Sequence, residues 1–159
     1  MKTYVITLAK TFPAWHPRKG EPTEFLEKFL NGQAGMSNAK LHTIRANYPL
    51  WEKRIKEVQL GKAVLSIRQW SGRPYCSKQV EIAMLTAVNV VGIQKLEIIN
   101  TWGVDRYTVL DNNLLAKFDV GPSELAKNDG LSLEDWLAWF KNYDRSLPMA
   151  IIHFTKFRY

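Results

Sequence analysis

The chain has 159 residues and a formal net charge of +7, and 46% of its residues are hydrophobic and 12% aromatic. This composition excludes a disordered chain and favours one domain over residues 1–159, and because no apolar run reaches about eighteen residues, we expect no membrane partner. Cys76 is the only cysteine, which excludes an internal disulfide and predicts a reduced thiol in a cytoplasmic protein.

Strand and helix patterns alternate along the first third of the chain. Residues 3–8 predict a strand, and the prolines and glycine of residues 11–20 predict an irregular connection. The one-sided apolar stripe of residues 24–30 predicts a helix, with Thr23 as its cap. A second stripe of the same kind predicts a helix over residues 51–58.

The rest of the chain predicts further short strands and two helices. Strands are expected at residues 62–68, 80–86, 94–100, 106–110 and 149–155. A short helix is expected at residues 123–127, and Ser132 caps another that reaches residue 140, with Asp135 completing a weak capping box. This second helix carries aromatic residues at helical spacing, which indicates core packing for Trp136, Trp139 and Phe140.

The order of these elements indicates the fold class. Helices are inserted between short strands, and no strand–helix–strand unit repeats along the chain. We therefore expect an α+β domain in which a small antiparallel or mixed β-barrel carries inserted and flanking helices.

Residues 40–45 place an amine, a hydroxyl and a guanidinium at the entrance of a predicted strand. Strand residues two apart share a face, so Thr43 and Arg45 are expected to point the same way. Lys40 is expected to lie in a turn just before the strand, from which its amine can reach that face. The structural interpretation is a solvated lysine, a strand-favouring threonine and an arginine in a salt bridge.

This segment, together with the order of elements over most of the chain, resembles the ASCH domain family of the PUA-like superfamily. The hallmark of that family is G-x-K-x-x-E-x-R, which Lys40 and Arg45 match, whereas Asn38 and Thr43 stand at its glycine and glutamate positions. A branch with threonine at the latter position includes the small bacterial N4-acetylcytidine amidohydrolases, with the signature K-T-x-T-x-R. The resemblance implies a PUA-like barrel.

In that branch the lysine, the threonine and a later glutamate carry catalysis. Residues 126–131 resemble the region of the glutamate, and they offer Asp129, which is shorter by one methylene. The resemblance thus implies that Lys40, Thr43 and Asp129 could supply a base, an oxyanion donor and a proton donor. Such a role requires that the pKa of Lys40 lie below its ordinary value of about 10.4. The structural interpretation of Asp129 is a turn residue in Asn-Asp-Gly.

The predicted loop after the strand at 62–68 combines cations with aromatic residues. In the recognition of single-stranded RNA, aromatic rings stack on bases and cations contact phosphates. Ligand-binding candidates are therefore Arg68, Trp70, Arg73, Tyr75 and Lys78. The alternative is that Trp70 and Tyr75 anchor the loop on the barrel. The excess of Lys and Arg over residues 1–110 also favours a polyanionic partner.

Other clusters give weaker signals. His16, His42 and His153 lie on different predicted elements without metal-ligand spacing, so we expect neither a metal nor a cofactor. Cys76 lies near Lys78, but no histidine is close in the sequence, and a catalytic cysteine is not expected.

Two functional hypotheses follow. The first is an ASCH-like domain that binds RNA or a small modified nucleoside in a cleft lined by Lys40, Thr43 and Arg45. The alternative is a metal-free amidohydrolase that removes an acyl group from N4 of a cytidine-type nucleoside through Lys40, Thr43 and Asp129. A third interpretation is an interaction platform with a vestigial cleft. The sequence carries no indication of an oligomeric state.

Overall fold

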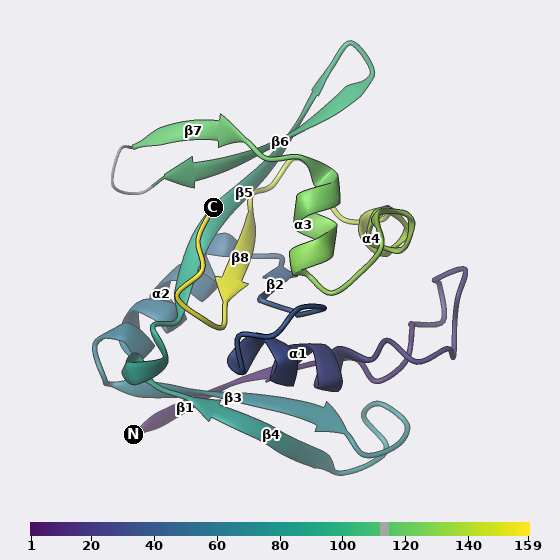
Figure 1. The fold of residues 1–159 in the computed structure, drawn as a ribbon. Helices are drawn as coiled ribbons and strands as arrows, with labels where there is room; N and C mark the ends of the chain where they lie inside the picture. The colour runs from purple at the N-terminus through teal and green to yellow at the C-terminus, as the bar shows by residue number, and fades with distance from the viewer. Residues whose placement is uncertain (112–114) are drawn as a thin grey trace.

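A computed structural model describes residues 1–111 and 115–159 (Figure 1). Its elements are eight strands and four α-helices, with one short 3-10 helix, η1 (Ala87–Asn89). The predicted α+β class is confirmed. Hydrogen bonding arranges the described strands as two separate sheets, one of three strands and one of five.

The smaller sheet has the order β1-β3-β4. β1 (Lys2–Thr7) runs parallel to β3 (Ala63–Trp70), and β3 forms an antiparallel hairpin with β4 (Gln79–Leu85). Thr7, at the end of β1, lies opposite Arg68 of β3. This register brings the end of the hairpin next to the segment that follows β1.

The larger sheet is antiparallel throughout and has the order β2-β8-β5-β6-β7. Its strands are β2 (His42–Arg45), β5 (Gly92–Thr101), β6 (Val104–Asp111), β7 (Ala116–Asp119) and β8 (Met149–His153). Every residue of β8 is buried, which is why its sequence is apolar almost without interruption. β7 and the short η1 helix were not predicted from the sequence.

The four α-helices occur where the sequence predicts them. They are α1 (Phe25–Gln33), α2 (Tyr48–Gln59), α3 (Pro122–Asn128) and α4 (Leu133–Phe140). Ser132 caps α4 as predicted, because its Oγ accepts from the Asp135 backbone N–H at 3.1 Å. The Asp135 carboxylate does not complete a capping box; it pairs instead with Arg18 at 2.6 Å. Near the start of α1, the Thr23 hydroxyl accepts from the Phe25 N–H at 3.3 Å.

One hydrophobic core lies between the two sheets. Helix α2 contacts β3 of the smaller sheet and both β5 and β8 of the larger one. It contributes Ile55 and Val58, which are completely buried with Leu65 and Leu96 of the sheets. Burial of such side chains is worth roughly 1.5–3 kcal/mol each, so α2 holds the sheets in a fixed relation.

Two further expectations concern membrane crossing and the single cysteine thiol. None of the described helices combines the length and the apolar character that crossing a membrane requires. Cys76 is an exposed free thiol, and the sequence holds no second cysteine to pair with it. The cytoplasmic location stays a prediction.

Two buried histidines face each other where the edge strand β2 of the larger sheet pairs with β8. His42 of β2 lies directly opposite His153 of β8, with ring centroids 5.6 Å apart. His42 Nε2 contacts the Tyr159 hydroxyl at 2.7 Å, and His153 Nε2 contacts Gln94 Oε1 at 2.9 Å. Neither Nδ1 atom has a hydrogen-bond partner among the described residues. Burial lowers the pKa of His42 well below its ordinary value and that of His153 to about 3.

These lowered pKa values predict that acid destabilises the fold. Below pH 6.5 the unfolded chain binds protons at both histidines, whereas the folded chain does not, so the free energy of unfolding falls as the pH drops toward 3. His153, with a folded pKa of about 3, should cost about 2 kcal/mol at pH 5 relative to neutral pH, and His42 adds to this loss. Urea unfolding of the wild type and of His153→Gln at pH 7 and pH 5 measures this loss. The variant should lose less stability than the wild type between pH 7 and pH 5, and an equal loss in both would contradict the assignment.

Candidate functional site

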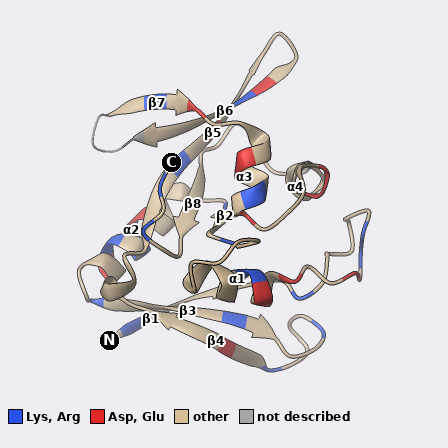
Figure 2. Cartoon of the chain, in the orientation of Figure 1, with Lys and Arg blue, Asp and Glu red and all other residues tan. Residues whose placement is uncertain are grey.

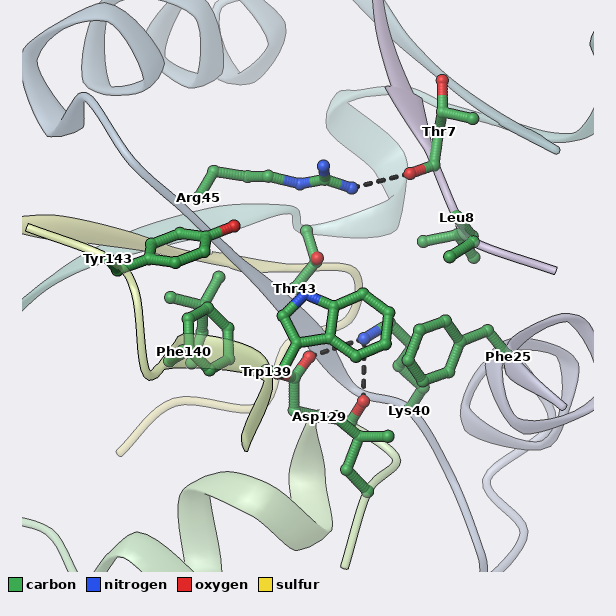
Figure 3. A pocket seen from close by; sticks show the side chains of 13 residues that line it. Thr7, Leu8, Phe25, Lys40, Thr43, Arg45, Asp129, Trp139, Phe140 and Tyr143 are labelled. Carbon is green, nitrogen blue, oxygen red and sulfur yellow. Dashed lines mark hydrogen bonds and ion pairs between the residues drawn. The ribbon is translucent and has the colours of Figure 1, made fainter. Parts of the chain in front are cut away.

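A cavity of about 70 Å³ lies where the end of β1, strand β2 and the α3–α4 connection meet (Figure 3). This space holds roughly five water molecules, which is enough for one small chemical group. Its polar lining comes from Lys40, Thr43, Arg45, Asp129 and Tyr143. The aromatic part of its wall comes from Phe25, Trp139 and Phe140.

Lys40 lies just before β2, as predicted, but residues 39–41 have no regular structure and do not form the expected turn. Its backbone N–H donates to Lys28 O of α1 at 2.9 Å, and the next N–H, that of Leu41, donates to Asn128 O of α3 at 2.7 Å. Gly130 makes this close approach feasible, because a Cβ at that position would lie 3.2 Å from Lys40 Cβ. Gly130 also has a φ of 82°, which favours glycine.

Lys40 and Asp129 form a buried ion pair. Lys40 Nζ lies 2.5 Å from Asp129 Oδ1 and donates a second hydrogen bond to Asp129 O at 2.7 Å. The two residues are only 2% and 3% exposed. The other carboxylate oxygen, Oδ2, accepts from Trp136 Nε1 at 3.1 Å, and the Lys40 ammonium lies 4.1 Å from the centroid of the Phe25 ring. Every oxygen of the carboxylate therefore has a partner.

Burial and the ion-pair contact have opposite effects on the pKa values of Lys40 and Asp129. Burial lowers the pKa of Lys40 and raises the pKa of Asp129, while their mutual attraction opposes both shifts. The free-energy gap between the ion pair and the neutral pair of amine and carboxylic acid is therefore narrower than it is in water. A proton can pass directly between the two groups across the 2.5 Å contact.

Thr43 and Arg45 both line the cavity, as the two-residue period of a strand predicts. Arg45 Nη2 donates to Thr7 O at 2.7 Å, whereas its Nε has no partner among the described residues. No carboxylate of the described residues lies within ion-pair distance of this guanidinium (Figure 3). Burial lowers the pKa of Arg45, and the nearby Tyr143 and Asp129 oppose that shift. The cavity thus keeps one cation that no carboxylate in the described part of the chain contacts.

The five candidates of the predicted loop do not line this cavity. They lie on the β3–β4 hairpin, where Arg68 Nε donates to Ser66 Oγ at 2.9 Å and Arg68 Nη1 donates to Gln79 at 3.3 Å. Trp70 is half-buried at the end of β3, and the loop exposes Arg73, Tyr75 and Lys78. The structure therefore joins four of the nine predicted site residues in one cavity and places the others beside it.

Several cavity residues were missed by the sequence analysis. Phe25 and Tyr143 were not singled out, and Trp139 and Phe140 were assigned to packing alone. Trp136 is buried as predicted, but its indole N–H also binds Asp129. The available signal was the run of aromatic residues three or four positions apart from 136 to 143, which starts shortly after Asp129 in the sequence.

The side chains of His, Cys, Asp and Glu are the possible metal ligands of this chain. Within residues 1–111 and 115–159, no group of three or more His, Cys, Asp or Glu side chains is arranged to hold a metal ion. The sheet register brings His42 and His153 together although they lie far apart in the sequence, and His42 Nδ1 is 3.9 Å from Asp129 Oδ1.

Comparison with protein-family models, with curated proteins and with solved structures found no match to this chain. The resemblance to the ASCH family therefore remains a prediction from the residues themselves.

The buried pair predicts an asymmetric response to mutation. Asp129→Asn leaves the Lys40 ammonium buried without a counter-charge, and it should lower the free energy of unfolding by about 3–5 kcal/mol. Adding Lys40→Met removes that unpaired charge and should recover part of the loss. Urea unfolding at pH 7 measures both changes.

The matched control for this pair is Asp119→Asn, which breaks an exposed pair with Arg106 and should change stability little. The assignment is wrong if Asp129→Asn costs no more than this control, or if the double variant is no more stable than Asp129→Asn.

Proposed function

We propose that this chain is an ASCH-like domain with a PUA-like arrangement of strands, and that it binds RNA or a modified nucleoside in the cavity. The hallmark positions Lys40, Thr43 and Arg45 support this proposal because all three line one cavity. The two sheets that share a single core would correspond to the halves of the small barrel expected from the resemblance.

The observation that carries the proposal is the half-buried side chain of Arg45, whose Nε is fully buried. It faces the cavity with an unpartnered Nε and no contacting carboxylate among the described residues. A buried charge without a full set of partners costs free energy, and a ligand that brings acceptor oxygens or nitrogens would remove this cost. The planar fork of arginine is suited to two adjacent acceptors, such as the keto oxygen and ring nitrogen of a base.

The rest of the lining fits a planar ligand. The ring of Trp139 offers a face for stacking, and the hydroxyls of Thr43 and Tyr143 offer further hydrogen bonds (Figure 3). A cavity of about 70 Å³ admits one base edge and not a whole nucleotide. A nucleobase that inserts its polar edge and leaves its sugar outside meets these conditions.

Titration calorimetry with cytidine and N4-acetylcytidine tests the binding. Arg45→Lys keeps the charge but loses the planar fork, and it should weaken binding about tenfold or more. Thr43→Val keeps the shape and removes the hydroxyl, and it should weaken binding several-fold, corresponding to about 1 kcal/mol.

The matched control is Arg106→Lys, an exposed arginine of β6 paired with Asp119, which should bind like the wild type. Circular dichroism checks that each variant is folded. The proposal fails if the folded wild type binds neither nucleoside, or if Arg45→Lys binds as tightly as the wild type.

A second candidate function is amide hydrolysis at the same site, and the Lys40–Asp129 contact favours it. In the neutral form of the pair, Lys40 takes a proton from a water molecule whose oxygen bonds to the acyl carbon. Protonated Asp129 then donates its proton to the leaving N4 as the C–N bond breaks. Thr43 and Arg45 donate hydrogen bonds to the oxyanion. Proton transfer from Lys40 to Asp129 across 2.5 Å restores the starting state.

Chromatographic assay of N4-acetylcytidine for release of cytidine tests this candidate. Lys40→Met should lower the rate at least about a hundredfold, because it removes the general base. The exposed Lys62→Met serves as the control and should keep the wild-type rate. Hydrolysis is excluded if the wild type binds N4-acetylcytidine and releases no cytidine, an outcome that leaves the binding proposal intact.

A further inference from the structure

The β3–β4 hairpin loop, residues 71–78, begins at the rim of the cavity. Thr7 connects the two: its backbone O accepts from Arg45 Nη2 at 2.7 Å, and its hydroxyl accepts from Gln79 Nε2 of β4 at 3.5 Å. The next residue, Leu8, lines the cavity and donates its N–H to Arg68 O at 2.7 Å. A ligand that leaves the cavity past the end of β1 therefore meets this hairpin.

The loop presents an aromatic ring to solvent. Tyr75 is 88% exposed, and its ring lies 5.2 Å from that of Trp70, centroid to centroid. Its φ of 63° is a costly conformation for a residue with a Cβ. Hydrogen bonds inside the loop hold the chain in place, among them Ser71 N to Lys78 O at 2.8 Å and Ser77 Oγ to Arg73 O at 2.8 Å. The ring is thus presented by an ordered loop.

The charged side chains at the hairpin end formed by residues 68–78 are all positive. Residues 68–78 contain Arg68, Arg73 and Lys78 and no acidic residue. Arg73 and Lys78 are exposed, and neither forms an ion pair with any described residue. Figure 2 shows blue segments on the hairpin and a red one on β4, and it shows both blue and red on the connection between β1 and α1. Cations beside a stacking surface are the arrangement that binds single-stranded nucleic acids.

The β5–β6 hairpin provides a contrast at the opposite end of the molecule (Figure 1). Its tip carries Trp102, which is 98% exposed and also has a positive φ, 55°. The charges near it are mixed, because Asp105 pairs with Arg145 and also accepts from Asn100. Exposed aromatic character is thus common to both hairpins, whereas unpaired positive charge distinguishes the β3–β4 loop.

We propose that the loop 71–78 and Trp70 hold the nucleotide adjacent to the one in the cavity, so that the ligand is a single-stranded polynucleotide and not a free nucleoside. This inference rests on the proposed function. The adjacent base stacks on Tyr75 and Trp70, and Arg73 and Lys78 contact the phosphates on either side of it. A double helix does not fit, because the cavity accepts a base only when that base is unpaired.

Fluorescence anisotropy with fluorescein-labelled single-stranded oligonucleotides of about eight cytidines tests the inference. The oligonucleotide should bind at least tenfold more tightly than cytidine. Tyr75→Ala should weaken oligonucleotide binding about tenfold and leave cytidine binding unchanged, while Tyr75→Phe, which keeps the ring, should bind like the wild type. Trp102→Ala is the matched control, since it removes an equally exposed ring, and it should have no effect.

Salt dependence tests the phosphate contacts separately. The double variant Arg73→Gln, Lys78→Gln should reduce the slope of log K against log salt concentration by about 1.4, which corresponds to two lost contacts on a single strand. Tight binding of either the RNA or the DNA oligonucleotide supports the inference. The form that binds more tightly shows whether the preferred ligand contains ribose or deoxyribose.

The outcomes separate the two proposals. If cytidine binds but the oligonucleotide binds no more tightly, or if Tyr75→Ala behaves like Trp102→Ala, the loop inference is wrong and the cavity remains the binding site. If neither probe binds the folded wild type, the proposed function is wrong and the inference falls with it.

Discussion

The buried contact between Lys40 and Asp129 is the interaction on which the site depends. It joins the segment before β2 to the end of α3, two parts of the chain that are 89 residues apart in the sequence. Removing two charges from water costs several kcal/mol per ion, so the pair persists because its hydrogen bonds are satisfied. Trp136 completes those bonds, and the absence of a side chain at Gly130 allows the backbones to approach.

The pair also determines what charge the cavity offers to a ligand. Lys40 and Asp129 neutralise each other, and Arg45 remains as a cation without a contacting carboxylate in the described part of the chain. In the proposed function, recognition and chemistry are therefore assigned to different groups: Arg45 would attract acceptor atoms, and Lys40 and Asp129 would exchange a proton. This division explains how the same cavity could bind a base with or without hydrolysing an acyl group on it.

The sequence predicted the parts of this site that depend on local patterns. A two-residue strand period placed Thr43 and Arg45 on one face, and the resemblance to a family motif singled out Lys40 and Asp129. It did not predict the two-sheet pairing or the meeting of His42 with His153, because strand register depends on contacts between distant segments. Phe25 and Tyr143 were missed for the same reason, since they belong to the start of α1 and to the segment after α4, which meet at the cavity only in the folded chain.

The central claim is that the cavity beside the Lys40–Asp129 pair is the ligand-binding site, and the indole N–H signals of the tryptophans test it most directly. The chain contains six tryptophans; Trp136 binds Asp129 and Trp139 lines the cavity, whereas Trp102 lies on the distant β5–β6 hairpin. A titration of ¹⁵N-labelled protein with cytidine, followed by NMR, should shift the signals of Trp136 and Trp139 and leave that of Trp102 unchanged. Unchanged signals from Trp136 and Trp139 at saturating cytidine would contradict the account.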